Sequence, residues 1–207
     1  MSGPMLLLTI TAVLIFSGLL QRVLDRMYLT DKQALLIIGL MLIGTFLPEL
    51  TIGAVSINIG GAIIPLAVCA YLFVRADQPW ERWRSVLGSI MAAAAVYAIS
   101  TLMPPEAETL PFDPIWLYGP VGGIIAWMLG RSRRCAFICG IVGVILADTA
   151  SAVAAWSQGY EVPLLLGGAG IADAAVISGV TAVLLCELIG ETIERLVRAW
   201  CERRNAH

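Results

Sequence analysis

Histidine is almost absent from this sequence of 207 residues, in which His207, the last residue, is the only one. A serine–histidine intramembrane protease and an HExxH metalloprotease both require histidine within the fold, either to move a proton or to hold zinc. The sequence therefore excludes both. Cys135 and Cys139 lie one helical turn apart, but two thiols alone make a poor metal site. We expect no bound metal and no cofactor.

Charged residues are scarce as well. They form 14% of the sequence, whereas about 25% is usual in soluble domains, and hydrophobic residues form 59%. Lipid alone can solvate such long apolar runs, so the sequence predicts an integral membrane protein. The 13 basic and 15 acidic residues give a net charge of −2. Because there is no excess of basic side chains to neutralise a phosphate backbone, nucleic-acid binding is excluded.

Seven apolar runs follow one another, and each can cross a bilayer as a helix if flanking residues join the second and fifth. They cover residues 4–21, 34–47, 54–74, 85–103, 115–130, 135–156 and 162–190. All Lys and Arg residues follow runs one, three, five or seven, and cytoplasmic loops concentrate these residues. We therefore predict an all-α integral membrane protein with seven transmembrane helices, an external N-terminus and a cytoplasmic C-terminus. Its expected location is the plasma membrane of a prokaryote.

The seven runs form one transmembrane domain, residues 1–190, followed by a basic tail, residues 191–207. Apolar residues recur at helical spacing in the tail beside several arginines, which is typical of an amphipathic helix on the cytoplasmic membrane surface. A plain extension of the seventh helix explains the same pattern. The five cysteines fall in the cytoplasmic half or in the tail, where thiols stay reduced, so no disulfide is expected.

Two acidic residues lie deep in apolar runs, Asp148 in the sixth and Asp173 in the seventh. Acids at such depth are costly and usually functional. Measured along the helices from the short loop between the two runs, Asp148 lies about 15 Å from the loop and Asp173 at most about 18 Å from it. The two acids are therefore expected at similar depth in the membrane. Two carboxyl groups that face each other in a dry site share one proton. The pair predicts aspartyl protease chemistry, in which one carboxylate activates water and its protonated partner donates to the scissile carbonyl.

Glycine is concentrated just before the second acid. Gly167, Gly168 and Gly170 precede Asp173, and such a stretch can leave helical geometry or let another backbone approach closely. We expect it to interrupt the seventh helix and to admit a peptide substrate. Simple helix packing by these glycines is the alternative.

A second interruption is expected in the third run, at Asn58, Gly60, Gly61 and Pro65. Proline removes a helical hydrogen bond, glycine loosens the chain, and an asparagine side chain can bond across helices. These residues are predicted to form a second wall of the substrate site. The alternative is a proline kink with one interhelical asparagine bond.

These segments together resemble a prokaryotic multi-spanning membrane family defined only as a domain of unknown function. The resemblance lies in the run from Asn58 to Pro65, in Asp148 with its neighbours and in the glycines before Asp173. More locally, the two acids are similar to the Gly-x-Gly-Asp class of intramembrane aspartyl proteases, which includes presenilin and signal peptide peptidase. That resemblance implies that Asp148 is the first catalytic acid and Asp173 the second.

The leading hypothesis is therefore an intramembrane aspartic endopeptidase in the lipid bilayer, acting on a membrane-spanning or membrane-inserted peptide. A small ion- or proton-coupled secondary transporter fits the same residues, because buried acids and paired interrupted helices also mark transport sites. In that function Asp148 and Asp173 bind a proton or a sodium ion. A third hypothesis is a non-catalytic assembly protein whose acids pair with Lys or Arg of a partner helix. The sequence does not indicate an oligomeric state.

Overall fold

The computed structural model describes residues 30–76, 78–102, 115–130 and 132–205. Within these ranges the chain is mainly helical, as the sequence predicts. The helices are α3 (Asp31–Thr45), α4 (Ile64–Val74), α5 (Pro79–Leu102), α6 (Ile115–Gly130), α7 (Arg133–Ser157) and α8 (Ala174–Asn205). A π-helical turn, η1 (Ile59–Ile63), leads into α4, and a short 3-10 turn, η3 (Gly170–Ala172), precedes α8. The first predicted span, residues 4–21, lies outside the described residues.

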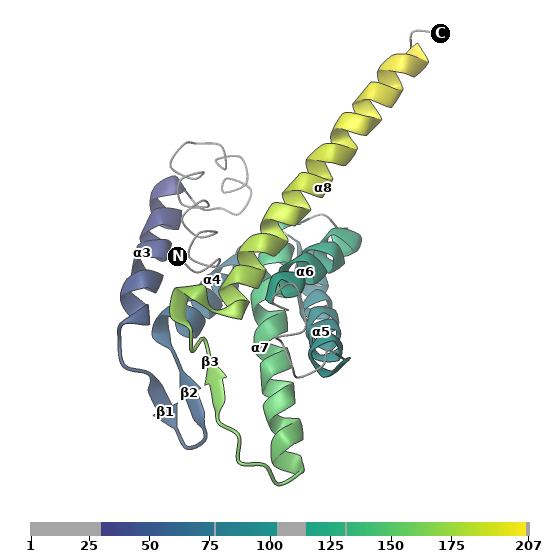
Figure 1. Cartoon of the computed structure of the whole chain (residues 1–207). Helices are drawn as coiled ribbons and strands as arrows, with labels where there is room; N and C mark the ends of the chain where they lie inside the picture. Colours follow the sequence, from purple (N-terminus) through teal and green to yellow (C-terminus); the bar gives the residue numbers. More distant parts are fainter. Residues whose placement is uncertain (1–29, 77, 103–114, 131, 206–207) are drawn as a thin grey trace.

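Helix α7 stands at the centre of the fold and packs against α4, α5, α6 and α8. Its buried face is built largely of small residues, including Ala136, Gly140 and Gly143, which lets neighbouring helices approach closely. The helix begins after Ser132, whose Oγ accepts a hydrogen bond from the Cys135 N–H at 3.3 Å. Figure 1 shows that α8 packs on this bundle with its first turns and then extends beyond it as one continuous helix, through residues 191–205.

Two of the described helices, α5 and α7, are long and apolar enough to cross a membrane. Only 28% of the apolar window of α5 is buried inside the protein, and Trp83, Leu87 and Ile90 are exposed on it. A lipid environment suits such an apolar, outward-facing surface. Four further apolar helices are shorter: Lys32–Thr45, Ile59–Val74, Leu117–Leu129 and Ala174–Gly190. The count of seven spans and their orientation remain predictions.

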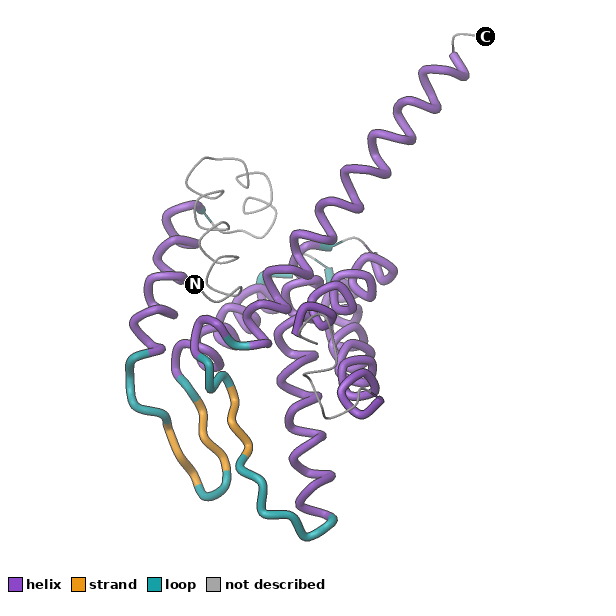
Figure 2. Tube along the Cα trace, viewed as in Figure 1, coloured by secondary structure: helices purple, strands orange, loops and turns teal. Residues whose placement is uncertain are grey.

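A small sheet of three strands was not expected from the sequence. Its strands are β1 (Leu50–Ile52), β2 (Val55–Ile57) and β3 (Leu164–Leu166), in the order β1-β2-β3. β1 and β2 form an antiparallel hairpin whose turn uses Gly53 at a positive φ of 62°, and β2 pairs with β3 in parallel, Ser56 opposite Leu165. Figure 2 shows the three strands side by side, below α3 and beside the lower half of α7.

The sheet corrects the interpretation of the third and seventh apolar runs as interrupted helices. Both runs begin as a strand, pass through a glycine-rich turn and only then become helix. A short apolar stretch suits a buried strand or a buried helix equally well, so periodicity alone does not separate the two. The pairing of β2 with β3 decides the outcome here, and it joins segments more than a hundred residues apart.

Candidate functional site

The two glycine-rich runs cross with their backbones in contact. A Cβ atom on Gly61 would overlap the carbonyl oxygen of Gly167 and would lie 2.6 Å from that of Gly170. Gly167 and Gly170 also have positive φ angles of 70° and 61°, which favour glycine. We call this contact of Gly61 with Gly167 and Gly170 the glycine crossing. It brings together the two interruptions that the sequence predicts.

Helix α3 closes a third side of the glycine crossing. A Cβ atom on Gly60 would lie 2.6 Å from the backbone nitrogen of Thr45, and a Cβ atom on Gly44 would lie 2.8 Å from the backbone nitrogen of Gly60. The Thr45 side chain faces Gly170. Gly168 differs from its neighbours, because it is exposed and a Cβ atom there would make an ordinary 3.5 Å contact with Leu165. Gly168 is therefore not needed for the crossing.

Asn58 organises the start of η1. Its side chain is buried, and Oδ1 accepts hydrogen bonds from the backbone N–H groups of Gly60 at 2.9 Å and Gly61 at 3.0 Å. The Asn58 backbone N–H donates to the Leu166 oxygen at 2.9 Å and so extends the pairing of β2 with β3. Asn58 is thus a helix cap that also joins the two interrupted segments.

Pro65 is the second residue of α4, directly after the π-helical turn η1 with which α4 is continuous. The kink that the sequence suggests is replaced by a change of structure, from β2 through the π-helical turn η1 into α4. Pro65 is buried and fixes the start of α4. It follows Asn58 and Gly61 in the sequence and belongs to the scaffold that supports them.

Asp173 caps the N-terminus of α8. Its backbone is extended, at φ −68° and ψ 150°, and its Oδ1 accepts a hydrogen bond from the Ala175 N–H at 2.9 Å. Its backbone oxygen accepts the first helical bond, from Ile177 N–H at 3.0 Å. An aspartate directly before an apolar helix is a common N-cap signal, and it is the signal that marks the true start of the seventh helix.

Asp148 projects from α7 and is exposed. Within the described part of the chain, no hydrogen bond reaches its carboxyl group. Asp148 and Asp173 lie close enough for their charges to interact, although they come from different helices. Asp173, at the start of α8 and next to the segment that contains the glycine crossing, therefore lies within electrostatic range of Asp148 on α7.

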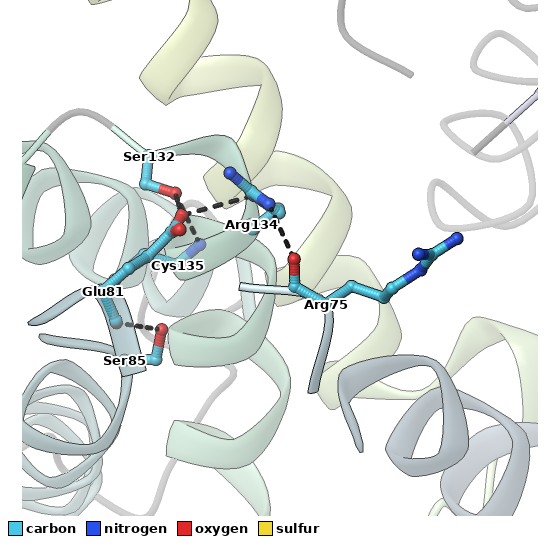
Figure 3. Close-up of polar contacts among 6 residues, drawn as sticks. All are labelled: Arg75, Glu81, Ser85, Ser132, Arg134 and Cys135. Carbon is cyan, nitrogen blue, oxygen red and sulfur yellow. Dashed lines mark hydrogen bonds and ion pairs between the residues drawn. The ribbon is translucent and has the colours of Figure 1, made fainter. Parts of the chain in front are cut away.

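A second polar cluster, which the sequence does not predict, joins α5 to α7 (Figure 3). Glu81 Oε1 accepts a hydrogen bond from Ser132 Oγ at 2.6 Å and forms an ion pair with Arg134 Nε at 3.2 Å. Arg134 Nη1 also donates to the backbone oxygen of Arg75 at 3.2 Å, at the end of α4. Nearby, Arg133 forms an ion pair with Glu187 of α8. The partners are about fifty residues apart, so sequence spacing does not reveal them.

We expect Glu81→Gln to lower the free energy of unfolding by roughly 1–3 kcal/mol, because it leaves Arg134 partly buried without its carboxylate. The Glu81 and Arg134 side chains are only 15% and 13% exposed. Unfolding of the purified protein in detergent measures the change. Glu161→Gln is the matched control, since Glu161 is exposed and the same charge is removed. Equal stability of the two variants would contradict a stabilising role for the cluster.

Comparisons with known proteins identify a family but no activity. Residues 20–185 match the family described as "Protein of unknown function (DUF1614)". No curated protein and no solved structure matches the chain. The resemblance to intramembrane aspartyl proteases therefore receives no support from these comparisons.

Proposed function

Because the chain belongs to the DUF1614 family, whose description names no activity, we propose a function from the site itself. The protein is an intramembrane aspartyl protease that cleaves a membrane-spanning or membrane-inserted peptide. The observation that supports the proposal is that Asp148 and Asp173 come from two different elements and lie within electrostatic range of each other.

The chemistry needs one proton shared by two carboxyl groups. The ionised carboxylate takes a proton from a water molecule as the water attacks the scissile carbonyl, and the protonated partner donates to the carbonyl oxygen. The tetrahedral intermediate then collapses as its C–N bond breaks and the leaving nitrogen takes up a proton. The bond from Ala175 N–H fixes the orientation of the Asp173 carboxyl group, and the exposure of Asp148 leaves that acid open to water and substrate.

A strand edge that carries no further strand, although α7 contacts β3, supports access by a peptide near the acids. β3 pairs with β2 on one side, and no other strand of the described structure pairs with its second side. An extended peptide can add to such an edge through backbone hydrogen bonds. Asp173 follows the end of β3 after the glycine-rich turn, so a peptide paired with β3 lies near the start of α8.

The arrangement of charge supports the predicted seven-span topology. Arg75, Glu81 and Arg134 gather at the end of the fold where α4 finishes and α7 begins. Glu161 lies in the loop after the other end of α7. In a membrane whose cytoplasmic side holds the arginines, α7 runs outward, as the sequence predicts. The proposed location is the plasma membrane of a prokaryote.

A cleavage assay tests the proposed function. Purified protein is reconstituted in liposomes with single-span peptides that carry a different tag at each end. We expect two fragments whose new ends map inside the membrane-spanning part of the substrate. Lack of cleavage across a broad substrate panel, by protein whose unfolding transition is intact, would contradict the proposal.

A second candidate, ion-coupled transport, is favoured by one specific observation. Two strand–turn–helix units, β2 to α4 and β3 to α8, contact each other at their glycine-rich turns. Paired interruptions of this kind are the sequence pointer to transport sites, where acids bind a proton or a cation. Asp148 and Asp173 are the groups available for that role.

Transport predicts an ion flux that proteolysis does not. In liposomes that enclose a pH-sensitive dye, a proton-coupled transporter gives an internal pH change when a transported solute is added. The flux falls to the level of empty liposomes in Asp148→Asn, because the amide carries no exchangeable charge. Under the protease proposal we expect no such flux from the wild-type protein.

A further inference from the structure

A small polar cavity of about 260 Å³ lies between the N-terminal ends of α5 and α7 and the C-terminal end of α6. Its walls include Trp80, Glu81, Arg84, Leu129, Ser132 and Arg134. It is smaller than the pockets of about 300–1,000 Å³ that hold whole drug-sized ligands. The cavity belongs to neither the glycine crossing nor the acid pair.

The charges in this cavity do not cancel. Glu81 is engaged by Ser132 and Arg134, as described above. Arg84 stacks over the Trp80 ring, with 5.5 Å between its guanidinium carbon and the ring centroid, and no carboxylate of the described structure pairs with it. Two arginines and one glutamate leave the lining with one net positive charge. An anion can therefore pair with Arg84 without displacing an existing ion pair.

The position of the cavity points to lipid as the source of the anion. Trp80 and Trp83 are 61% and 64% exposed at the start of α5, at the arginine-rich end of the fold. Exposed tryptophans beside arginines are typical of the membrane–water interface. Leu129 and Ala126 add an apolar wall to the cavity, which suits the part of a lipid next to its phosphate. Basic pockets between helices on this side of a membrane bind anionic head groups.

We propose that this cavity binds the phosphate of an anionic phospholipid head group, with Arg84 as its principal ion-pair partner. The phosphate oxygens accept hydrogen bonds from the guanidinium group, and Trp80 holds that group in place by stacking. Free inorganic phosphate offers the same chemistry and is distinguished in the experiment. The proposal does not depend on the protease function.

The experiment is a binding titration of the full chain in detergent, followed by native mass spectrometry. The probes are phosphatidylglycerol, phosphatidylcholine and inorganic phosphate. We expect preferential retention of phosphatidylglycerol, and a loss of about tenfold in its affinity in Arg84→Gln, because one charge-assisted interaction is removed. Arg84→Lys keeps the charge and should retain most of the binding, which also separates the result from a folding defect.

Arg82→Gln is the matched control. It removes the same charge two residues away, but Arg82 is exposed, donates to the Val74 oxygen and is absent from the cavity walls. Its affinity for phosphatidylglycerol should stay within about twofold of the wild type. Competition by millimolar inorganic phosphate that is lost in Arg84→Gln supports a phosphate site at Arg84, whereas tighter binding of inorganic phosphate than of phosphatidylglycerol assigns free phosphate as the ligand and overturns the lipid assignment. Equal binding of phosphatidylglycerol by the Arg84→Gln and Arg82→Gln variants overturns the proposal. The proposal is also overturned if the wild-type protein binds phosphatidylglycerol and phosphatidylcholine equally well and binds no inorganic phosphate.

Discussion

Replacing Asp148 or Asp173 with asparagine is expected to lower the rate of peptide cleavage by at least roughly 10²–10⁴-fold, the usual contribution of general acid–base catalysis. An amide has nearly the size of a carboxyl group but neither accepts nor supplies the shared proton. Either substitution therefore removes the pair, so the double variant should be no slower than the single ones. The rate of fragment formation in liposomes measures the effect.

Asparagine also separates catalysis from folding at position 173. The Asp173 side chain caps α8 through its bond with Ala175 N–H, and asparagine caps helices about as well as aspartate. Asp173→Asn should thus keep the unfolding temperature while losing activity. Asp173→Ala should lose activity and also about 1 kcal/mol of stability, because the cap is removed.

Glu161→Gln, which changes an exposed acid in the loop after α7, is the control for loss of charge alone. It should cleave at the wild-type rate. Full activity in either Asp148→Asn or Asp173→Asn would exclude the shared-proton mechanism, even if the protein proved to be a protease by other means.

Gly167→Ala is expected to destabilise the fold by roughly 2–4 kcal/mol, the second large effect. The alanine Cβ would overlap the backbone of Gly61 and would also have to adopt a φ of 70°. Neither strain can be relieved by a rotamer change, since the colliding atoms are backbone. Unfolding in detergent, followed by tryptophan fluorescence, measures the loss.

The neighbouring glycine supplies the control. Gly168→Ala adds the same methyl group one residue later, where it meets Leu165 at an ordinary contact distance. Its stability should remain within about 0.5 kcal/mol of the wild type. Gly61→Ala, on the opposite side of the glycine crossing, should resemble Gly167→Ala. Similar stability of Gly167→Ala and Gly168→Ala would mean that the backbones are not in contact.

Asp148 and Asp173 could be singled out from the sequence because their signals are strong and local, and their role as a catalytic pair stays a prediction. Asp148 and Asp173 stand out in apolar runs, and the short loop between α7 and β3 limits how far apart they can lie. The two glycine-rich segments were recognised in the same way. The contact between Gly61 and Gly167 forms only when the chain folds. From the sequence, one can expect no more than that the two glycine-rich segments line the same site.

The strands and the helix caps are the features of the fold that the sequence analysis does not predict. Residues 55–57 and 164–166 are too short to reveal a period, and each becomes a strand because the other is available as a partner. In the sequence analysis, Asn58 is assigned to a substrate site or an interhelical bond and Asp173 to catalysis, yet both cap helices. The capping signal is present in the sequence, but the prediction of helix on both sides of each interruption concealed it. The Glu81 cluster was missed because its partners are distant along the chain.

The parallel pairing of β2 with β3 also orders events during synthesis of the protein. Val55 lacks its partner in β3 until Leu164 has left the ribosome, and Asp173 follows later still. Until then β2 can pair only with β1, and Asp148 on α7 has no Asp173 nearby. Contacts that are so distant along the chain form slowly and late. A ribosome-bound chain that ends before residue 164 is thus unable to assemble the acid pair, so any activity that depends on the pair begins only once synthesis has passed Asp173.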